Sequence, residues 1–349
     1  MIFNTYNGIR ISAISAAVPS RILDISALGN SPGEDPKYIE DFIKNTAVTR
    51  KHVAAANQTA SDFACAAVKV LEENKRYQAD EIGVLINVTQ TPDYRTPSTA
   101  LLIHKRLGLS KNCIAFDINL GCSGFVYGVS VGASLLTTST ATKALVVMGD
   151  TLARGRIGEE KRTTNSSLLM GDASVAILLE KGDGCCIRSG LMSDGEGYNV
   201  LSRPYGAWRH PEPSDGIVAD DIAVFKFAIK EVPKLIKEFT ERVGCAVADY
   251  DGVFLHQANM MILKTISKRL GIPNEKCGIS LDRYGNTSNA SVPVTIVDRY
   301  GEDKSTREVN LLTSGFGIGL SWGVLDFEIN TDHIYPMVET AAVYNDDFR

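Results

Sequence analysis

Residues 117–125, Asp-Ile-Asn-Leu-Gly-Cys-Ser-Gly-Phe, decide how the rest of this chain is interpreted. A hydrophobic strand ends here, the chain turns on Gly121, and Cys122 precedes a segment of small apolar residues, 123–136, without a charge. Such a segment is typical of a buried helix. We expect the helix N-terminus to lower the pKa of the Cys122 thiol, as it does for nucleophilic cysteines. A cysteine beside glycine is nevertheless more often an inert core residue, so other motifs must decide.

Composition sets the broad class. The chain has 349 residues, 44% hydrophobic and 22% charged, which is ordinary for a globular protein of one large domain or two smaller ones. Its net charge of -5 argues against nucleic-acid binding. The N-terminus lacks the pattern of a secretion signal and no apolar run approaches a membrane span, so we expect a cytoplasmic protein. Seven cysteines without a Cys-x-x-Cys pair make a disulfide framework or a metal site unexpected.

Buried strands alternate with helices along the chain. Short, almost wholly apolar runs predict central strands at residues 82–88, 113–119, 144–148 and 173–179. Helical patterns cover residues 61–74, before the first of these strands, and residues 99–107, between the first and the second. This alternation predicts a layered α/β fold.

The second half of the chain repeats the first. Residues 80–87 (DEIGVLIN) match 249–256 (DYDGVFLH), and 117–122 (DINLGC) match 282–286 (DRYGN) with one residue dropped. The repeat predicts two halves related by a pseudo-two-fold axis, which we divide into residues 1–190 and 191–349. It makes Cys122 and Asn286 related positions and brings equivalent strand ends together at the centre of the molecule.

Two further polar residues stand at predicted junctions between a strand and a helix. His256 follows the apolar run 253–255, and Asn286 lies in the sequence GNTSNAS. A single histidine there is more often a packed or capping residue, and Asn after Gly is usually a turn residue or a helix cap. Together with Cys122, however, they form a thiol, an imidazole and a carboxamide that would meet at one buried point.

These motifs resemble one family. GCSGF at 121–125, HQAN at 256–259, GNTSNAS at 285–291 and GFGIGLSWG at 315–323 look like the motifs of β-ketoacyl-acyl carrier protein synthase III, in the thiolase superfamily. The similarity runs from about residue 8 to residue 327. It implies a thiolase-like five-layered α-β-α-β-α fold, a homodimer, and a catalytic set of Cys122, His256 and Asn286.

The resemblance also implies a mechanism. Cys122 would take an acyl group from a thioester, and His256 and Asn286 would stabilise the enolate formed when a malonyl thioester loses carbon dioxide. The N–H groups of Cys122 and Ile318 would form the oxyanion hole. Thioesters of coenzyme A or acyl carrier protein would be the substrates, without a further cofactor. An acyltransferase or polyketide-type synthase that acylates a non-malonyl acceptor, and a non-catalytic partner of a synthase, remain as alternatives.

Some positions depart from the family pattern. Residues 41–49 (DFIKNTAVT) lack the tryptophan and arginine that hold the adenine nucleotide in similar enzymes, which favours a carrier protein over coenzyme A as acyl donor. Thr96 and Phe316 are expected to line the acyl pocket, Thr96 from across the dimer, and its small side chain suggests a longer or bulkier acyl group. Lys264, Lys268 and Arg269 either dock an acidic carrier protein or form a solvated helix face.

Overall fold

The computed structural model describes residues 1–31, 35–153, 165–212 and 217–346. The strands are β1 (Ile2–Pro19), β2 (Ile22–Asp24), β3 (Arg50–His52), β4 (Ile82–Val88), β5 (Ile114–Ile118), β6 (Lys143–Asp150), β7 (Ala173–Ser193), β8 (Leu201–Ser202), β9 (Val218–Ala219), β10 (Gly252–Leu255), β11 (Glu308–Gly317), β12 (Ser321–Asn330) and β13 (Val338–Thr340). The α-helices are α1 (Ile25–Leu28), α2 (Pro36–Thr46), α3 (Ala60–Glu73), α4 (Thr99–Arg106), α5 (Gly124–Thr138), α6 (Asn165–Leu169), α7 (Asp221–Val243), α8 (Met260–Leu270), α9 (Leu281–Tyr284) and α10 (Ser291–Tyr300). Short 3-10 turns are η1 (Ala79–Glu81), η2 (Gly195–Gly197), η3 (Val247–Asp249), η4 (Ser288–Ala290) and η5 (Thr331–His333).

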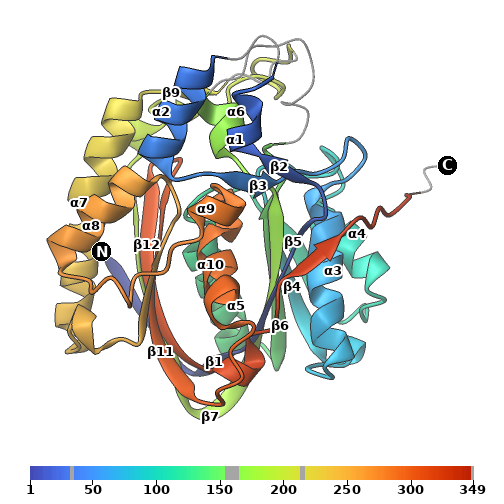
Figure 1. Ribbon diagram of the computed structural model, residues 1–349. Helices are drawn as coiled ribbons and strands as arrows, with labels where there is room; N and C mark the ends of the chain where they lie inside the picture. Colours follow the sequence, from blue (N-terminus) through green and yellow to red (C-terminus); the bar gives the residue numbers. More distant parts are fainter. Residues whose placement is uncertain (32–34, 154–164, 213–216, 347–349) are drawn as a thin grey trace.

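Helices and strands form five layers. Hydrogen bonds order the main strands as β10-β11-β12-β7-β6-β4-β5, while β1 pairs with β7 and with β13. Figure 1 shows the sheet bending where β1 and β7 turn, so that α5 and α10 lie between its two arms, with α7 and α8 outside one arm and α3 and α4 outside the other. The predicted α-β-α-β-α architecture is therefore confirmed.

The repeat seen in the sequence is also visible in the connections. In the first half, η1, β4, α4, β5, the Cys122 turn, α5 and β6 follow one another. In the second half, η3, β10, α8, a single bridge from Cys277 to β10, the Asn286 turn, α10 and β11 follow in the same order. The two cores form one body, because β7 runs without interruption through the sequence boundary placed at residue 190.

Helix α5 is buried because its sequence is small and apolar. Phe125, Val129 and Leu136 are fully buried in it. A Cβ added at Gly128 would come within 2.8 Å of Val88 in β4, so only glycine allows the helix to lie this close to the sheet. This contact brings the N-terminus of α5, and the cysteine before it, to the centre of the molecule. Within the described ranges, no helix is long and apolar enough to cross a membrane.

Candidate active site

Cys122 lies in a tight turn between β5 and α5. The Gly124 N–H donates to the Gly121 carbonyl at 2.6 Å, which closes a turn that contains Cys122 and Ser123. The opposite wall is the end of β11, where a Cβ on Gly317 would lie 2.7 Å from the Cys122 Cβ. The backbone of one half of the chain therefore presses directly against the cysteine of the other half. Cys122 lies deep in the protein, although part of the residue remains accessible to solvent.

Burial dominates the electrostatics of this cysteine. Burial, and after it the negative charge of Asp150, raise the pKa of the Cys122 thiol to about 12. The Cys122 N–H, the Ser288 hydroxyl and the Ile318 N–H act in the opposite direction, because each stabilises the thiolate. The predicted lowering of the pKa by the helix is thus wrong for this state. Helix α5 begins only at Gly124, and its N-terminus does not outweigh the loss of solvent.

Two backbone N–H groups face the Cys122 sulfur. They belong to Cys122 and to Ile318, the pair that the sequence predicts as an oxyanion hole. Ile318 follows Gly317, whose backbone φ of +159° is rarely adopted by residues other than glycine. The turn after β11 therefore depends on glycine both for its backbone conformation and for its close approach to the thiol.

His256 comes directly after β10, and its orientation follows from its hydrogen bonds. The Ser291 hydroxyl lies 2.7 Å from its Nδ1 and accepts the Gln257 N–H at 3.3 Å. When the Ser291 hydroxyl donates its hydrogen to Nδ1, the neutral ring carries its own hydrogen on Nε2. Burial lowers the pKa of His256 to about 3, although the Ser288 carbonyl favours the protonated ring. The imidazole is therefore neutral and presents an N–H donor.

Asn286 is held by its backbone from both sides. Its N–H donates to the Leu169 carbonyl at 2.9 Å, and its carbonyl accepts the Gly171 N–H at 3.0 Å. Its side-chain Oδ1 accepts the Ser288 N–H at 2.9 Å. Since that oxygen is used, the amide NH₂ is the group left to act on a substrate, and it can only donate.

Ser288 connects the three predicted catalytic residues. Its N–H donates to the Asn286 side chain, and its carbonyl accepts a hydrogen bond from the His256 ring. Its hydroxyl forms a hydrogen bond with the Cys122 sulfur. Its φ of +55° is unusual for a residue other than glycine, and such strain is typical of functional sites. The structure thus brings Cys122, His256 and Asn286 around one residue, as the sequence predicts.

A polar layer behind the nucleophile was missed in the sequence. The Gln90 Nε2 donates to the Ser288 hydroxyl at 3.1 Å and to the buried Asp150 carboxylate at 3.3 Å. The same amide packs against Gly121, where an added Cβ would lie 2.4 Å from Nε2. Ser288 and Ser291 were visible within GNTSNAS, but nothing in the sequence distinguished Gln90 or Asp150 from ordinary polar residues at the ends of strands.

The other predicted site residues fall in three places. The Phe316 ring packs edge-on against His256, with centroids 5.4 Å apart, so it borders the site. Thr96 is exposed in the loop before α4. Lys264 and Lys268 are exposed one turn apart on α8, whereas the Arg269 guanidinium donates to the Ile229 carbonyl of α7 at 2.5 Å.

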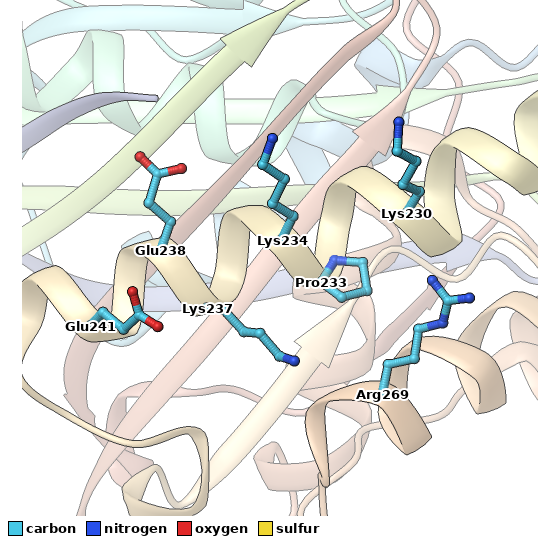
Figure 2. Close-up of a pocket in the computed structure, with 7 residues that line it drawn as sticks. All are labelled: Lys230, Pro233, Lys234, Lys237, Glu238, Glu241 and Arg269. Carbon is cyan, nitrogen blue, oxygen red and sulfur yellow. The ribbon is translucent and has the colours of Figure 1, made fainter.

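Basic side chains continue from α8 onto α7. Between the two helices lies an open cavity of about 540 Å³, shown in Figure 2. It is lined by Lys230, Pro233, Lys234, Lys237, Glu238, Glu241 and Arg269. The cations lie mainly toward the first part of α7 and the two glutamates toward its end, so the groove has a charge gradient.

Known proteins share both the sequence and the fold. Residues 116–195 match the model of 3-oxoacyl-[acyl-carrier-protein] synthase III, and residues 240–329 match the model of its C-terminal part. The chain is 35% identical to a β-ketoacyl-[acyl-carrier-protein] synthase III of Clostridium perfringens, over 80% of this chain and 87% of that one. A relative of the same name in Xanthomonas campestris is 33% identical over 90% and 96% of the two chains.

Solved structures lead to the same group. A 3-oxoacyl-(acyl-carrier protein) synthase of Burkholderia xenovorans superposes with a TM-score of 0.88 at 32% identity, over 97% of this chain and 99% of that one. A priming β-ketosynthase of a polyketide pathway has a TM-score of 0.81 at 24% identity, which shows a common fold. The chain belongs to the 3-oxoacyl-[acyl-carrier-protein] synthase III family.

Proposed function

We propose that the chain is an acyltransferase that joins an acyl group held on Cys122 to a malonyl thioester by decarboxylative Claisen condensation. The observation that supports this most is the convergence of Cys122, His256 and Asn286 on Ser288. The same family name in relatives that match most of the chain supports the reaction class.

The first step loads the enzyme. The Cys122 sulfur attacks the thioester carbonyl, the N–H groups of Cys122 and Ile318 stabilise the oxyanion, and the carrier thiol leaves with the proton that the cysteine gives up. The raised pKa of Cys122 means that the resting enzyme carries a thiol. Its ionisation is therefore coupled to the arrival of a thioester.

The second step forms the carbon–carbon bond. The His256 Nε2–H and the Asn286 amide donate to the malonyl thioester oxygen as carbon dioxide leaves, and the resulting enolate carbon attacks the acyl-cysteine. The β-ketoacyl thioester departs, and the Cys122 thiolate takes up a proton. Both donors are neutral, so neither adds a charge that must be neutralised in the buried site. These steps need thioester substrates and no further cofactor.

Acyl carrier protein is the substrate carrier that the surface favours. Lys264 and Lys268 of α8, with Lys230 and Lys234 of α7, give this face a positive charge that suits an acidic carrier. The stretch 41–49 lacks the nucleotide-binding residues of similar enzymes, which supports the same preference. We further propose a cytoplasmic homodimer, in which the exposed Thr96 reaches the acyl pocket of the partner subunit.

Intact-mass analysis tests this function. The protein is mixed with acyl-carrier and acyl-coenzyme A thioesters, followed by a malonyl thioester labelled in its free carboxyl group. Wild type should gain one acyl mass and release labelled carbon dioxide, whereas Cys122→Ala should gain no acyl mass and form no β-ketoacyl product. Cys186→Ala, which removes an exposed cysteine, is the matched control and should behave as wild type. Acylation of Cys122 without release of carbon dioxide would favour a non-malonyl acceptor.

A further inference from the structure

The C-terminal residues after β12, residues 331–346, lie across the first half of the molecule, and we call them the strap. The match to the family model ends at residue 329, and the described chain continues to residue 346. Strand β13 adds to β1 in parallel, with Ala17 opposite Val338. Figure 1 shows the chain passing from β13 over α3 toward α4. The strap therefore ends beside the loop of residues 90–98, which precedes α4.

Specific polar contacts fix this strap. The Gln58 Nε2 donates to the Ala342 carbonyl at 3.1 Å, and the Tyr344 N–H donates to the Asp62 carboxylate at 3.0 Å. The Arg106 guanidinium lies over the Tyr344 ring, 4.9 Å from its centroid. These contacts join the strap to α3 and α4 by hydrogen bonds and a cation–π contact.

Asp346 connects the strap to the loop. Its Oδ2 accepts the Arg106 Nη2–H at 2.8 Å and the Tyr94 hydroxyl at 3.1 Å. The same arginine lies 3.7 Å from Asp62 and 3.7 Å from Asp93, and all four side chains are largely buried. Ion pairs out of water are sensitive to the loss of one member, because the remaining charge stays buried. Asp346 thus completes a buried cluster that includes a loop residue.

The other end of this loop belongs to the active site. Gln90 contacts Gly121, Ser288 and Asp150, and it lies four positions from Tyr94. Thr96 lies two positions beyond Tyr94. Tyr94 is thus only a few backbone bonds from Gln90, beside Cys122, and from Thr96, the residue expected at the acyl pocket. A change in the contacts of Tyr94 is therefore expected to shift both.

We propose that the strap, through the contacts of Asp346 with Tyr94 and Arg106, holds the loop of residues 90–98 in place and thereby limits the size of the acyl group that Cys122 accepts. This proposal rests on the acyl-transfer function proposed above. Tyr94 and Asp346 act here as positioning residues, since neither is placed against the reacting atoms. When the strap is detached, the loop can move more freely. The rate of Cys122 acylation by bulky acyl groups then rises relative to the rate for small ones.

Two matched variants test the strap. Tyr94→Phe removes one hydroxyl, Asp346→Ala removes the acceptor, and Asn345→Ala changes an exposed neighbour as the control. The ratio of Cys122 acylation rates for long over short acyl thioesters should rise about tenfold in Asp346→Ala, as for the loss of a charge-assisted hydrogen bond. Tyr94→Phe should raise it less, and the double variant should not exceed Asp346→Ala, because the variants share one contact.

Hydrogen exchange of residues 90–98 provides a readout without any acyl group. Exchange should become faster in Asp346→Ala and stay unchanged in Asn345→Ala. Unchanged exchange in Asp346→Ala would overturn the strap even if wild type accepted no thioester, a result that would count separately against the proposed function. Faster exchange with equal slowing of every acyl group would overturn the role in specificity, because simple destabilisation slows all substrates alike.

Discussion

The turn that carries Cys122 and the turn that carries Asn286 occupy equivalent places in the two halves, but different buried carboxylates lie behind them. Asp150 lies behind Cys122 and accepts hydrogen bonds from neutral groups, among them the Gln90 N–H at 2.7 Å and the Thr89 hydroxyl at 3.1 Å. Asp172 lies beside the Asn286 turn and accepts the N–H groups of Ala54 and Ala153, both at 2.8 Å.

The second carboxylate has a buried cation, Lys51, close enough to affect its pKa. Lys51 is fully buried, and its Nζ donates to the Ser167 carbonyl and to the Met170 carbonyl at 2.7 Å. Burial lowers the pKa of Lys51 to about 8, and the charge of Asp172 opposes that change. Burial raises the pKa of Asp172 to about 6, which its hydrogen bonds and Lys51 oppose.

The difference matches the chemistry of each turn. At Cys122 burial and the negative charge of Asp150 both raise the pKa of the thiol, so the residue rests in its protonated form. Asn286 does not titrate, and it needs only to be held in place. Lys51 binds the carbonyls of Ser167 and Met170, and the two residues that flank Met170, Leu169 and Gly171, pair with Asn286. The surroundings of the first turn therefore set the protonation state of Cys122, whereas those of the second turn set the position of Asn286.

Asn286→Asp should have the largest effect on this comparison. It keeps the shape of the side chain, replaces the donor by an acceptor, and places a second negative charge where the enolate forms. We expect malonyl decarboxylation to fall by about 10³-fold or more, beyond the effect of losing one oxyanion donor, while Cys122 is still acylated. Release of labelled carbon dioxide measures the first quantity and intact mass the second.

Asn259→Asp is the control for that variant. Asn259 caps α8 through its Oδ1, which accepts the Ile262 N–H at 2.9 Å, and aspartate caps a helix equally well. Decarboxylation should therefore stay near the wild-type rate. If Asn286→Asp retained more than a tenth of the wild-type rate, the donor role of Asn286 would be refuted.

Lys51→Met should have the next largest effect. It removes the donor from two carbonyls and leaves Asp172 buried without its cation, so we expect a loss of about 3 kcal/mol in the free energy of unfolding. Decarboxylation should fall about 10- to 100-fold through displacement of Asn286, and acylation of Cys122 much less. Thermal unfolding and the two activity assays measure these changes.

Lys51→Met/Asp172→Asn separates stability from positioning. Removing the unpaired charge should recover part of the lost stability. Decarboxylation should remain low, because the two carbonyls still lack a donor. Equal losses of acylation and decarboxylation in Lys51→Met would instead show a purely structural lysine.

The same contrast explains what the sequence predicted. The layers, the repeat and the three catalytic candidates depend on patterns local to short segments, such as the apolar run before Cys122 and the small residues after it. The carboxylates behind the turns come from distant strands, and their partners, such as Lys51 and Gln90, are identified only once the strands are packed. The pKa of Cys122 was mispredicted for this reason, because helix position is local whereas burial and the charge of Asp150 depend on the whole fold.

The ionisation of Cys122 tests the other side of the comparison, with a smaller expected effect. Because the pKa of the thiol lies near 12, the thiolate fraction should rise about tenfold for each pH unit between pH 7 and 10, and alkylation by iodoacetamide should follow without a plateau. Peptide mass mapping measures labelling of Cys122, with the exposed Cys186 in the same sample reporting on the reagent.

Asp150→Asn should then accelerate alkylation of Cys122 at a fixed pH. Removing the negative charge lowers the pKa of the thiol, but burial, the larger cause, remains, so we expect a gain of no more than about tenfold. The rate should still rise with pH over the same range. A plateau below pH 8 in wild type would mean that the N-terminus of α5 and the surrounding N–H groups outweigh both burial and Asp150. The two turns would then differ in shape alone, and the charge behind Cys122 would have no part in keeping the resting enzyme protonated.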